Sequence, residues 1–297
     1  MTAARRASVL ASLWSLLCCA ALAQEPVPSV SVVRPQGERV PWRGIPPEEM
    51  AGSQGAMLYP APNALGLLAA IFTHAAIVQG SREAERKAKQ QAADKVLEPY
   101  AAALAEMAPA RLLESALGKV EARVRMADSA ASADGSWIIE MQPVFALAPD
   151  QRTVVLDNAI KLYAVGQGHT PLFANIVRVV SSARPEGAAD AALTAEALVE
   201  ESAQMLAHSI EIVVHPAARA AQNASAKTQR YRFGEIEKME RGVPLASGCN
   251  RVVLRTLREW LMSVPVQPAD GDVPVCAHGY RLALPPATAA ATAATGN

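Results

Sequence analysis

The chain has 297 residues, of which 51% are hydrophobic but only 4% aromatic, so alanine, valine and leucine supply most of its apolar surface. Its 28 basic residues balance its 28 acidic residues. This balance argues against a strongly basic nucleic-acid-binding protein and against an acidic, solvating chain. The high apolar fraction argues against disorder throughout, and the length allows one large domain or two modest ones.

Residues 1–23 are typical of a secretory signal peptide. Arg5 and Arg6 form a short positive region, and Ala7–Leu22 is an apolar stretch that is short for a membrane-spanning helix. Ala21-Leu22-Ala23 supplies the small residues that a signal peptidase requires, which places cleavage directly after it. The pattern predicts export, with a periplasmic or secreted location after cleavage. Membrane association is the alternative location.

Cleavage would leave two cysteines, Cys249 and Cys276, with 26 residues between them. An even pair in an exported protein predicts a disulfide bond. Two separate buried thiols are the alternative interpretation. No C-x-x-C or H-x-x-x-H spacing accompanies the pair, so a metal site there is disfavoured.

Residues 24–62 are predicted to form an extended, proline-rich leader, in which Ser29–Val33 alone favours a short strand. A helix is expected to begin at Asn63, and its first half, 64–78, is apolar almost all round. This half suits burial in a core or against a partner. Its length also lies at the low edge for a membrane span, and basic residues follow it. The side chains expected to make the apolar or membrane contact are Leu65, Leu68, Ile71 and Phe72.

The hydrophobic period changes from helical to alternating after Gly118. Four strand-like runs, at 120–126, 137–147, 153–165 and 173–180, follow one another between turn residues, which predicts an antiparallel β-meander. The first and third runs alternate apolar and polar residues. Pro143 inside the second run predicts an edge position or a bulge. Helical periodicity returns over 188–209, with 210–214 ambiguous, and 228–266 is again typical of strands, although 252–261 also fits a short helix.

The expected fold class is therefore α+β, with N-terminal helices packed on an antiparallel β-meander and a small C-terminal β module. The expected domains are a core over 63–215 and the C-terminal module over 228–284. Residues 285–297 are a low-complexity alanine and threonine tail that is expected to be disordered.

Three common motifs of catalytic and nucleotide-binding sites are absent from the sequence. It contains no G-x-S-x-G nucleophile elbow and no Walker A loop, and Gly166-Gln167-Gly168 lacks the third glycine of a dinucleotide site. The five histidines show no metal-ligand spacing. We therefore predict no catalytic residue, no cofactor and no metal ligand.

One segment of the chain is more basic than the rest. Between Arg219 and Glu259 there are nine basic residues and four acidic ones, and strand pairing would bring several arginines together. The predicted anionic-partner patch consists of Arg230, Tyr231, Arg232, Arg251, Arg255 and Arg258. Outside the cytoplasm its partner would be a lipid headgroup or an envelope polymer rather than nucleic acid. A solvated sheet face carrying alternating arginines is the alternative interpretation.

These observations favour an exported bacterial cell-envelope protein that binds or scaffolds a partner without catalysing a reaction. The expected partners are an envelope protein, an anionic lipid or a polymer, with membrane contact an open alternative and the oligomeric state undetermined. A periplasmic enzyme whose site is assembled from distant residues, and a membrane-anchored protein spanning at 64–78, are the competing hypotheses.

Overall fold

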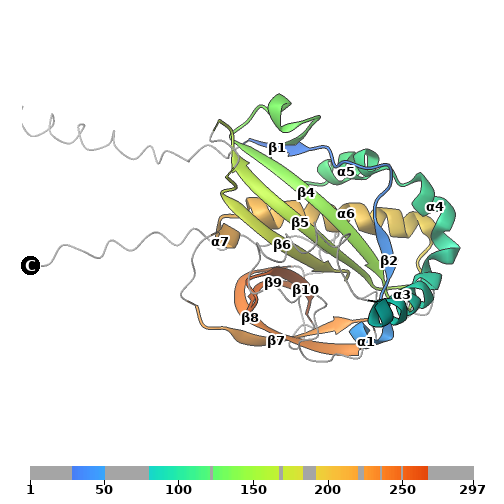
Figure 1. Ribbon diagram of the computed structural model, residues 1–297. Helices are drawn as coiled ribbons and strands as arrows, with labels where there is room; N and C mark the ends of the chain where they lie inside the picture. Colours follow the sequence, from blue (N-terminus) through green and yellow to red (C-terminus); the bar gives the residue numbers. More distant parts are fainter. Residues whose placement is uncertain are drawn as a thin grey trace, which may run out of the picture.

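The fold was examined in a computed structural model, which describes residues 29–50, 80–120, 123–166, 170–182, 192–219, 224–234, 236–248 and 250–266. Ten strands form one mixed sheet in the order β3-β1-β4-β5-β6-β10-β9-β8-β7, with β2 also paired to β4 (Figure 1). The strands are β1 (Val30–Val33), β2 (Trp42–Gly44), β3 (Val124–Ala127), β4 (Trp137–Leu147), β5 (Val154–Ala164), β6 (Phe173–Val180), β7 (Lys227–Phe233), β8 (Ile236–Gly248), β9 (Arg251–Thr256) and β10 (Leu261–Pro265).

The helices lie along one side of this sheet and at its edge. The longest, α6 (Ala195–Val214), packs on β5 and β6, and it also contacts α5 (Pro109–Leu117). Helix α3 (Gly80–Asp94) contacts β2 at the edge of the sheet. The remaining helical segments are α1 (Pro47–Met50), η1 (Lys95–Tyr100), α4 (Ala101–Glu106), η2 (Ala130–Ser132) and α7 (Pro216–Arg219).

The predicted fold class is wrong. The described part of the chain is mostly one ten-stranded mixed sheet, and its longest helix is the mid-chain α6 rather than an N-terminal one. Helices α3 and α5 do not form the expected layer on a meander, because α3 contacts strand β2 and α5 contacts α6 and β3. The apolar helix expected over 64–78 lies outside the described residues. The ambiguous segment 210–214 continues α6.

The antiparallel meander is present only for β4, β5 and β6. The strand expected to precede β4 in it, β3, instead pairs in parallel with β1, which lies between β3 and β4. Strand β1 therefore comes from the predicted surface leader yet is buried, with Val30 and Val32 at most 1% exposed. The local strand prediction at Ser29–Val33 was confirmed, but its place inside the sheet was not foreseen.

Pro143 lies at an interruption in the strand pairing. Along the same edge of β4, strand β1 pairs with 137–139 and strand β2 pairs with 145–147. The Phe145 N–H donates to the Pro41 carbonyl on this edge at 3.0 Å, so the nitrogen of Pro143, two residues away, faces the same edge. Since neither β1 nor β2 pairs with β4 at Pro143, the missing N–H of this proline removes no hydrogen bond between strands.

The C-terminal strands are not the separate module that was expected. Strand β10 runs parallel to β6 and pairs with it, so that β7 to β10 continue the central sheet. The sheet then curls: β7 contacts β10 although two strands lie between them in the pairing order. Side chains from both ends of the curl share one core cluster, which contains Val155, Val180, Tyr231, Phe233 and Met262. Figure 1 shows β8, β9 and β10 bending round beneath the meander.

Strand β8 contains the residues that allow this bend. A Cβ at Gly242 would press on the backbone carbonyl of Arg255 in the neighbouring strand, so only glycine fits there. The pairing with β9 shifts register between Pro244 and Ala246. A glycine and a bulge in one strand both increase its local bending, which brings the β7–β8 hairpin over the meander.

The turn of the β7–β8 hairpin rests on the turn between β4 and β5. Gly234 has φ +59°, and a Cβ there would overlap the carboxylate of Asp150. That carboxylate accepts hydrogen bonds from the backbone N–H of Arg152 and from the N–H and hydroxyl of Thr153, at 2.8–3.0 Å. The contact closes the curl at one end.

We predict that Gly234→Ala destabilises the protein far more than Gly166→Ala. Both glycines have positive φ, at +59° and +79°, so both variants incur left-handed strain of about 1–2 kcal/mol. Gly166 has open space where a Cβ would point, whereas Gly234 meets Asp150. Urea unfolding followed by circular dichroism should show a loss of about 1 kcal/mol for Gly166→Ala and about 3 kcal/mol for Gly234→Ala. Equal losses of unfolding free energy in the two variants would contradict the contact between the two turns.

Candidate functional site

The inner surface of the curl carries a tight ion pair. Arg178 on β6 and Asp157 on β5 are cross-strand partners, and both guanidinium–carboxylate contacts are 2.6 Å. The guanidinium also lies 5.4 Å from the ring centroid of Trp260. Burial alone would lower the pKa of Arg178, but the Asp157 carboxylate more than reverses this, so the pKa is raised. The ion pair with Asp157 thus occupies hydrogen-bond donors of the Arg178 guanidinium that a ligand would otherwise use.

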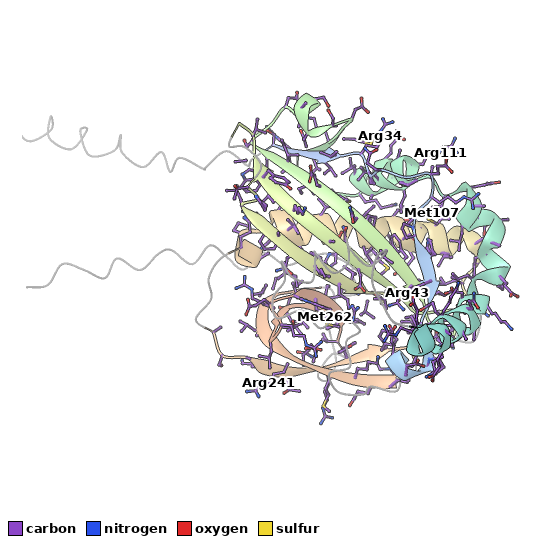
Figure 2. The ribbon with its side chains drawn as sticks, viewed as in Figure 1. Arg34, Arg43, Met107, Arg111, Arg241 and Met262 are labelled. Atoms are coloured by element: carbon purple, nitrogen blue, oxygen red, sulfur yellow. The ribbon has the colours of Figure 1, made fainter. Side chains whose placement is uncertain are left out.

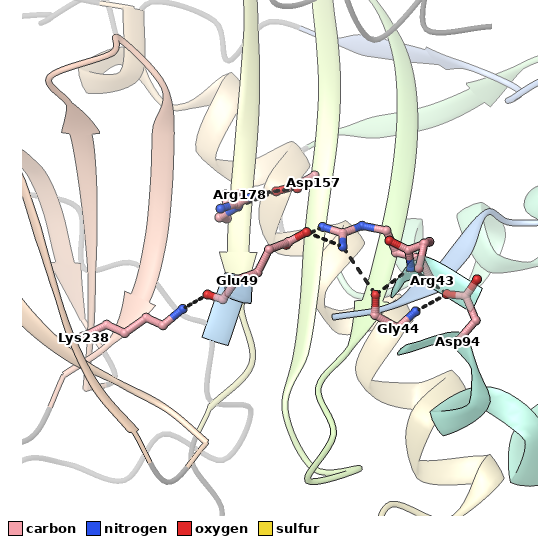
Figure 3. A network of polar contacts seen from close by, with 8 residues as sticks. Arg43, Gly44, Glu49, Asp94, Asp157, Arg178 and Lys238 are labelled. Atoms are coloured by element: carbon pink, nitrogen blue, oxygen red, sulfur yellow. Dashed lines mark hydrogen bonds and ion pairs between the residues drawn. The ribbon is translucent and has the colours of Figure 1, made fainter. Parts of the chain in front are cut away.

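Helix α1 joins the N-terminal strands to the hairpin through Glu49. The Glu49 carboxylate accepts two hydrogen bonds from the Arg43 guanidinium at 3.0 and 3.1 Å, and the Glu49 backbone carbonyl accepts one from Lys238 Nζ at 2.7 Å. Figure 3 shows Glu49 between these two cations. Lys238 Nζ also lies 4.1 Å from the centroid of the Phe233 ring. This bridge ties β2 to β8 across the open side of the curl.

Helix α3 holds β2 in place from the other side. The Gly44 N–H donates to Asp94 Oδ1 at 2.8 Å, and Gln90 Nε2 donates to the Gly44 carbonyl at 3.0 Å. A Cβ at Gly44 would overlap the carbonyl of Ala93, so glycine permits the close packing of helix on strand. These contacts support the strand that carries Arg43.

The charges inside the curl are balanced and stabilise the fold. Three cations face three anions there: Arg43, Arg178 and Lys238 against Glu49, Asp157 and Glu240. Burial raises the pKa of Glu240 and lowers the pKa of Lys238, and in both cases it disfavours the charged form. Burial also raises the pKa of Tyr231 to about 12. We interpret this cluster as a structural element that joins distant parts of the sheet.

A second buried cluster contains residue types that hydrolases use. His208 Nε2 lies 2.9 Å from Ser263 Oγ, and His208 Nδ1 lies 3.8 Å from the Glu211 carboxylate. The distance to Glu211 is longer than a hydrogen bond. A nucleophilic serine must be reached by its substrate, yet Ser263 is 0% and His208 1% exposed. This cluster joins α6 to β10.

Arg251, a member of the predicted anionic-partner patch, belongs to this buried cluster instead. It is 1% exposed and donates hydrogen bonds to the Ser263 hydroxyl at 3.2 Å and to the Ser182 hydroxyl at 3.0 Å. It also donates to the Val180 and Ser263 carbonyls. Its guanidinium therefore joins β9, β10 and the end of β6, and it does not reach a surface partner.

The predicted patch is otherwise divided between two faces of the β7–β8 hairpin. Tyr231 points into the core at 7% exposure, while Arg230 and Arg232, its neighbours in the strand, point outward. Arg255 is partly buried and donates to the Ala218 carbonyl at 2.9 Å. Arg258 is exposed in the turn between β9 and β10. Of the six predicted residues, Arg230 and Arg258 are thus the two that lie fully exposed.

The outward face of the hairpin also carries residues that were not in the predicted patch. Cross-strand pairing places Arg230 beside Met239 and Thr228 beside Arg241 on this face. The adjoining turn brings in Leu257, whose N–H donates to the Arg241 carbonyl at 3.3 Å. We name the set Arg230, Met239, Arg241 and Leu257 the arginine face. Arg258 does not belong to the set, because its charge acts on Glu240, whose side chain lies inside the curl. Figure 2 shows Arg241 projecting from the hairpin while Met262 lies within the curl.

Other predicted features fall outside the described residues or find no matching geometry within them. Cys249, Cys276 and the apolar helix with Leu65, Leu68, Ile71 and Phe72 lie outside the described residues. Among the residues described, no group of His, Cys, Asp and Glu side chains is arranged to hold a metal ion. None of the described helices combines the length and the apolar character needed to cross a membrane.

A small, partly open pocket of about 10 Å³ lies where α6 and α7 meet β8 and β9. This volume holds about one water molecule, which is far below the size of a substrate site. The lining residues are Ile212, His215, Ala218, Leu245, Ala246 and Val253.

Comparison of the chain with models of protein families, with curated proteins and with solved structures found no match.

We predict that Tyr163 and Tyr231 titrate near pH 12 in the folded protein. Burial, followed by the Glu140 carboxylate 3.1 Å away, raises the pKa of Tyr163 to about 12, and burial raises that of Tyr231 equally. A raised tyrosine pKa favours the folded state below the ordinary value near 10, and this stability is lost as the pH rises toward 12. Phenolate absorbance at alkaline pH measures the two late ionisations.

The variant Tyr231→Phe is expected to remove one of the two late ionisations, and denaturant is expected to return both to about pH 10. If Tyr231→Phe left the late ionisation unchanged while the protein stayed folded, Tyr231 would not be buried within the curl.

Proposed function

We propose that the protein is a non-enzymatic binding protein of the bacterial cell envelope that docks on an anionic partner through the arginine face. The observation that supports this is the grouping of two exposed arginines, Arg230 and Arg241, with two exposed large apolar side chains. Met239 is 57% and Leu257 61% exposed. Such a grouping on the surface of a folded chain marks an interaction site.

The charges of the arginine face contrast with those inside the curl. Inside, each cation lies close to a buried or half-buried anion. Outside, Arg230 lies 3.6 Å from Glu237, and both side chains are largely exposed, at 72% and 52%. A surface pair of this kind contributes little and exchanges readily for a stronger anionic partner. The face therefore retains net positive charge.

The predicted export signal limits the class of partner. Outside the cytoplasm, the abundant polyanions are lipid headgroups and envelope polymers, and nucleic acid is not the expected partner. Arginine suits either anion because its planar guanidinium donates two parallel hydrogen bonds to a phosphate or carboxylate.

We predict that replacing Arg230 and Arg241 together by serine weakens binding to a polyanion at least about tenfold at low salt. The measurement is retention of the full chain on immobilised dextran sulfate, with the salt concentration of elution recorded. The matched control replaces Arg86 and Arg111, which are exposed on α3 and α5, and removes the same two charges. Figure 2 shows Arg111 far from Arg241.

The control variant should elute at the salt concentration of the parent protein. Equal weakening in both variants would mean that binding follows net charge alone, and this would contradict a site on the arginine face.

A further inference from the structure

We propose that the partner of the arginine face is the anionic headgroup layer of a lipid bilayer, into which Met239 and Leu257 insert. This rests on the proposed function and names the partner. The observation behind it is that the two apolar side chains are as exposed as any in the described structure and lie among the arginines rather than apart from them.

The backbone holds both apolar side chains at fixed positions. Met239 is the direct cross-strand partner of Arg230 in the β7–β8 ladder. Leu257 stands in a short turn that is closed by the Thr256 N–H to the Trp260 carbonyl and by the Glu259 N–H to the Thr256 carbonyl, both at 2.9 Å. Trp260 anchors the turn, since it is only 3% exposed. The arginine face therefore presents its apolar groups on a supported surface.

The mixture of residue types favours a lipid surface over a soluble polymer. A hydrated polyanion needs only cations, and exposed Met and Leu side chains add nothing to its binding. At a bilayer, arginine binds the phosphate while its methylene groups lie along apolar material, and the apolar side chains enter the boundary of headgroup and acyl chain. One surface with both residue types therefore matches the chemistry of an anionic bilayer.

Charge disfavours a second copy of this chain as the occupant. Two arginine faces brought together would oppose Arg230 and Arg241 with their own copies, and like charges across an interface suppress association. An anionic bilayer supplies the opposite charge.

The chain offers a matched control for the apolar pair. Leu172 is 56% exposed near the start of β6, and Val199 is 37% exposed on α6. Neither belongs to the arginine face. Replacing these two by serine removes exposed apolar surface of the same kind as replacing Met239 and Leu257.

The test is sedimentation of the full chain with vesicles of phosphatidylcholine alone or mixed with phosphatidylglycerol. We expect binding to the anionic vesicles only. The double variant M239S/L257S should bind them at least about tenfold more weakly, yet keep the dextran sulfate retention of the parent protein. The control L172S/V199S should behave as the parent protein in both assays, and circular dichroism confirms that each variant is folded.

The other outcomes are separable. Equal binding to neutral vesicles overturns the anionic headgroup layer as the partner. Unchanged vesicle binding by M239S/L257S overturns insertion of the two apolar side chains into a bilayer. Both outcomes leave a polyanion site on the arginine face. Unchanged dextran sulfate retention after replacement of Arg230 and Arg241 overturns the proposed function itself. A dimer in sedimentation velocity that is lost in M239S/L257S overturns the bilayer in favour of a second copy.

Discussion

The central strands β4, β5 and β6 carry buried side chains on both faces, and both faces need a cover. Helix α6 covers one face, where it buries residues such as Leu198 and Leu206. The other face is covered by the sheet itself, because β8 bends at Gly242 and brings the β7–β8 hairpin across it. The inward side of the hairpin is therefore occupied by core residues and balanced charges. Its outward side faces solvent, and the arginine face lies there.

Local patterns predicted the elements well but not their pairing. The runs at 137–147 and 173–180 coincide with β4 and β6, because apolar runs bounded by turn residues are local signals. The insertion of β1 between β3 and β4 depends on contacts with residues about a hundred positions away, and a proline-rich leader gives no sign of it. Likewise, a single glycine in a strand-like run gives no local sign that Gly242 permits the bend that joins the C-terminal strands to the sheet. At 210–214, packing on the sheet prevailed over the strand preference of isoleucine and valine.

The candidate site, too, was predicted only in part, because sequence patterns record local structure and not long-range packing. Expected strand pairing placed Arg230, Arg232 and Arg251 in one patch. Arg230 and Arg232 do share the outward face of β7, whereas Arg251 is buried. Its burial follows from the packing of α6 and β6 against β10, which no local pattern records. Met239 and Leu257 were missed because a single apolar residue in a strand or turn is read as core. Their exposure becomes visible only when the inward face of the hairpin is known.

The central claim is that the arginine face, and no other side of the protein, touches the apolar layer of an anionic bilayer. Its most direct test places a tryptophan reporter at Leu257 and measures quenching by anionic lipids that are brominated on their acyl chains. The Leu257→Trp emission should be quenched beyond that of the parent protein, while Val199→Trp on α6, on the other side of the sheet, should show no added quenching. Added quenching at Val199→Trp, or none at Leu257→Trp in the bound protein, would contradict this orientation.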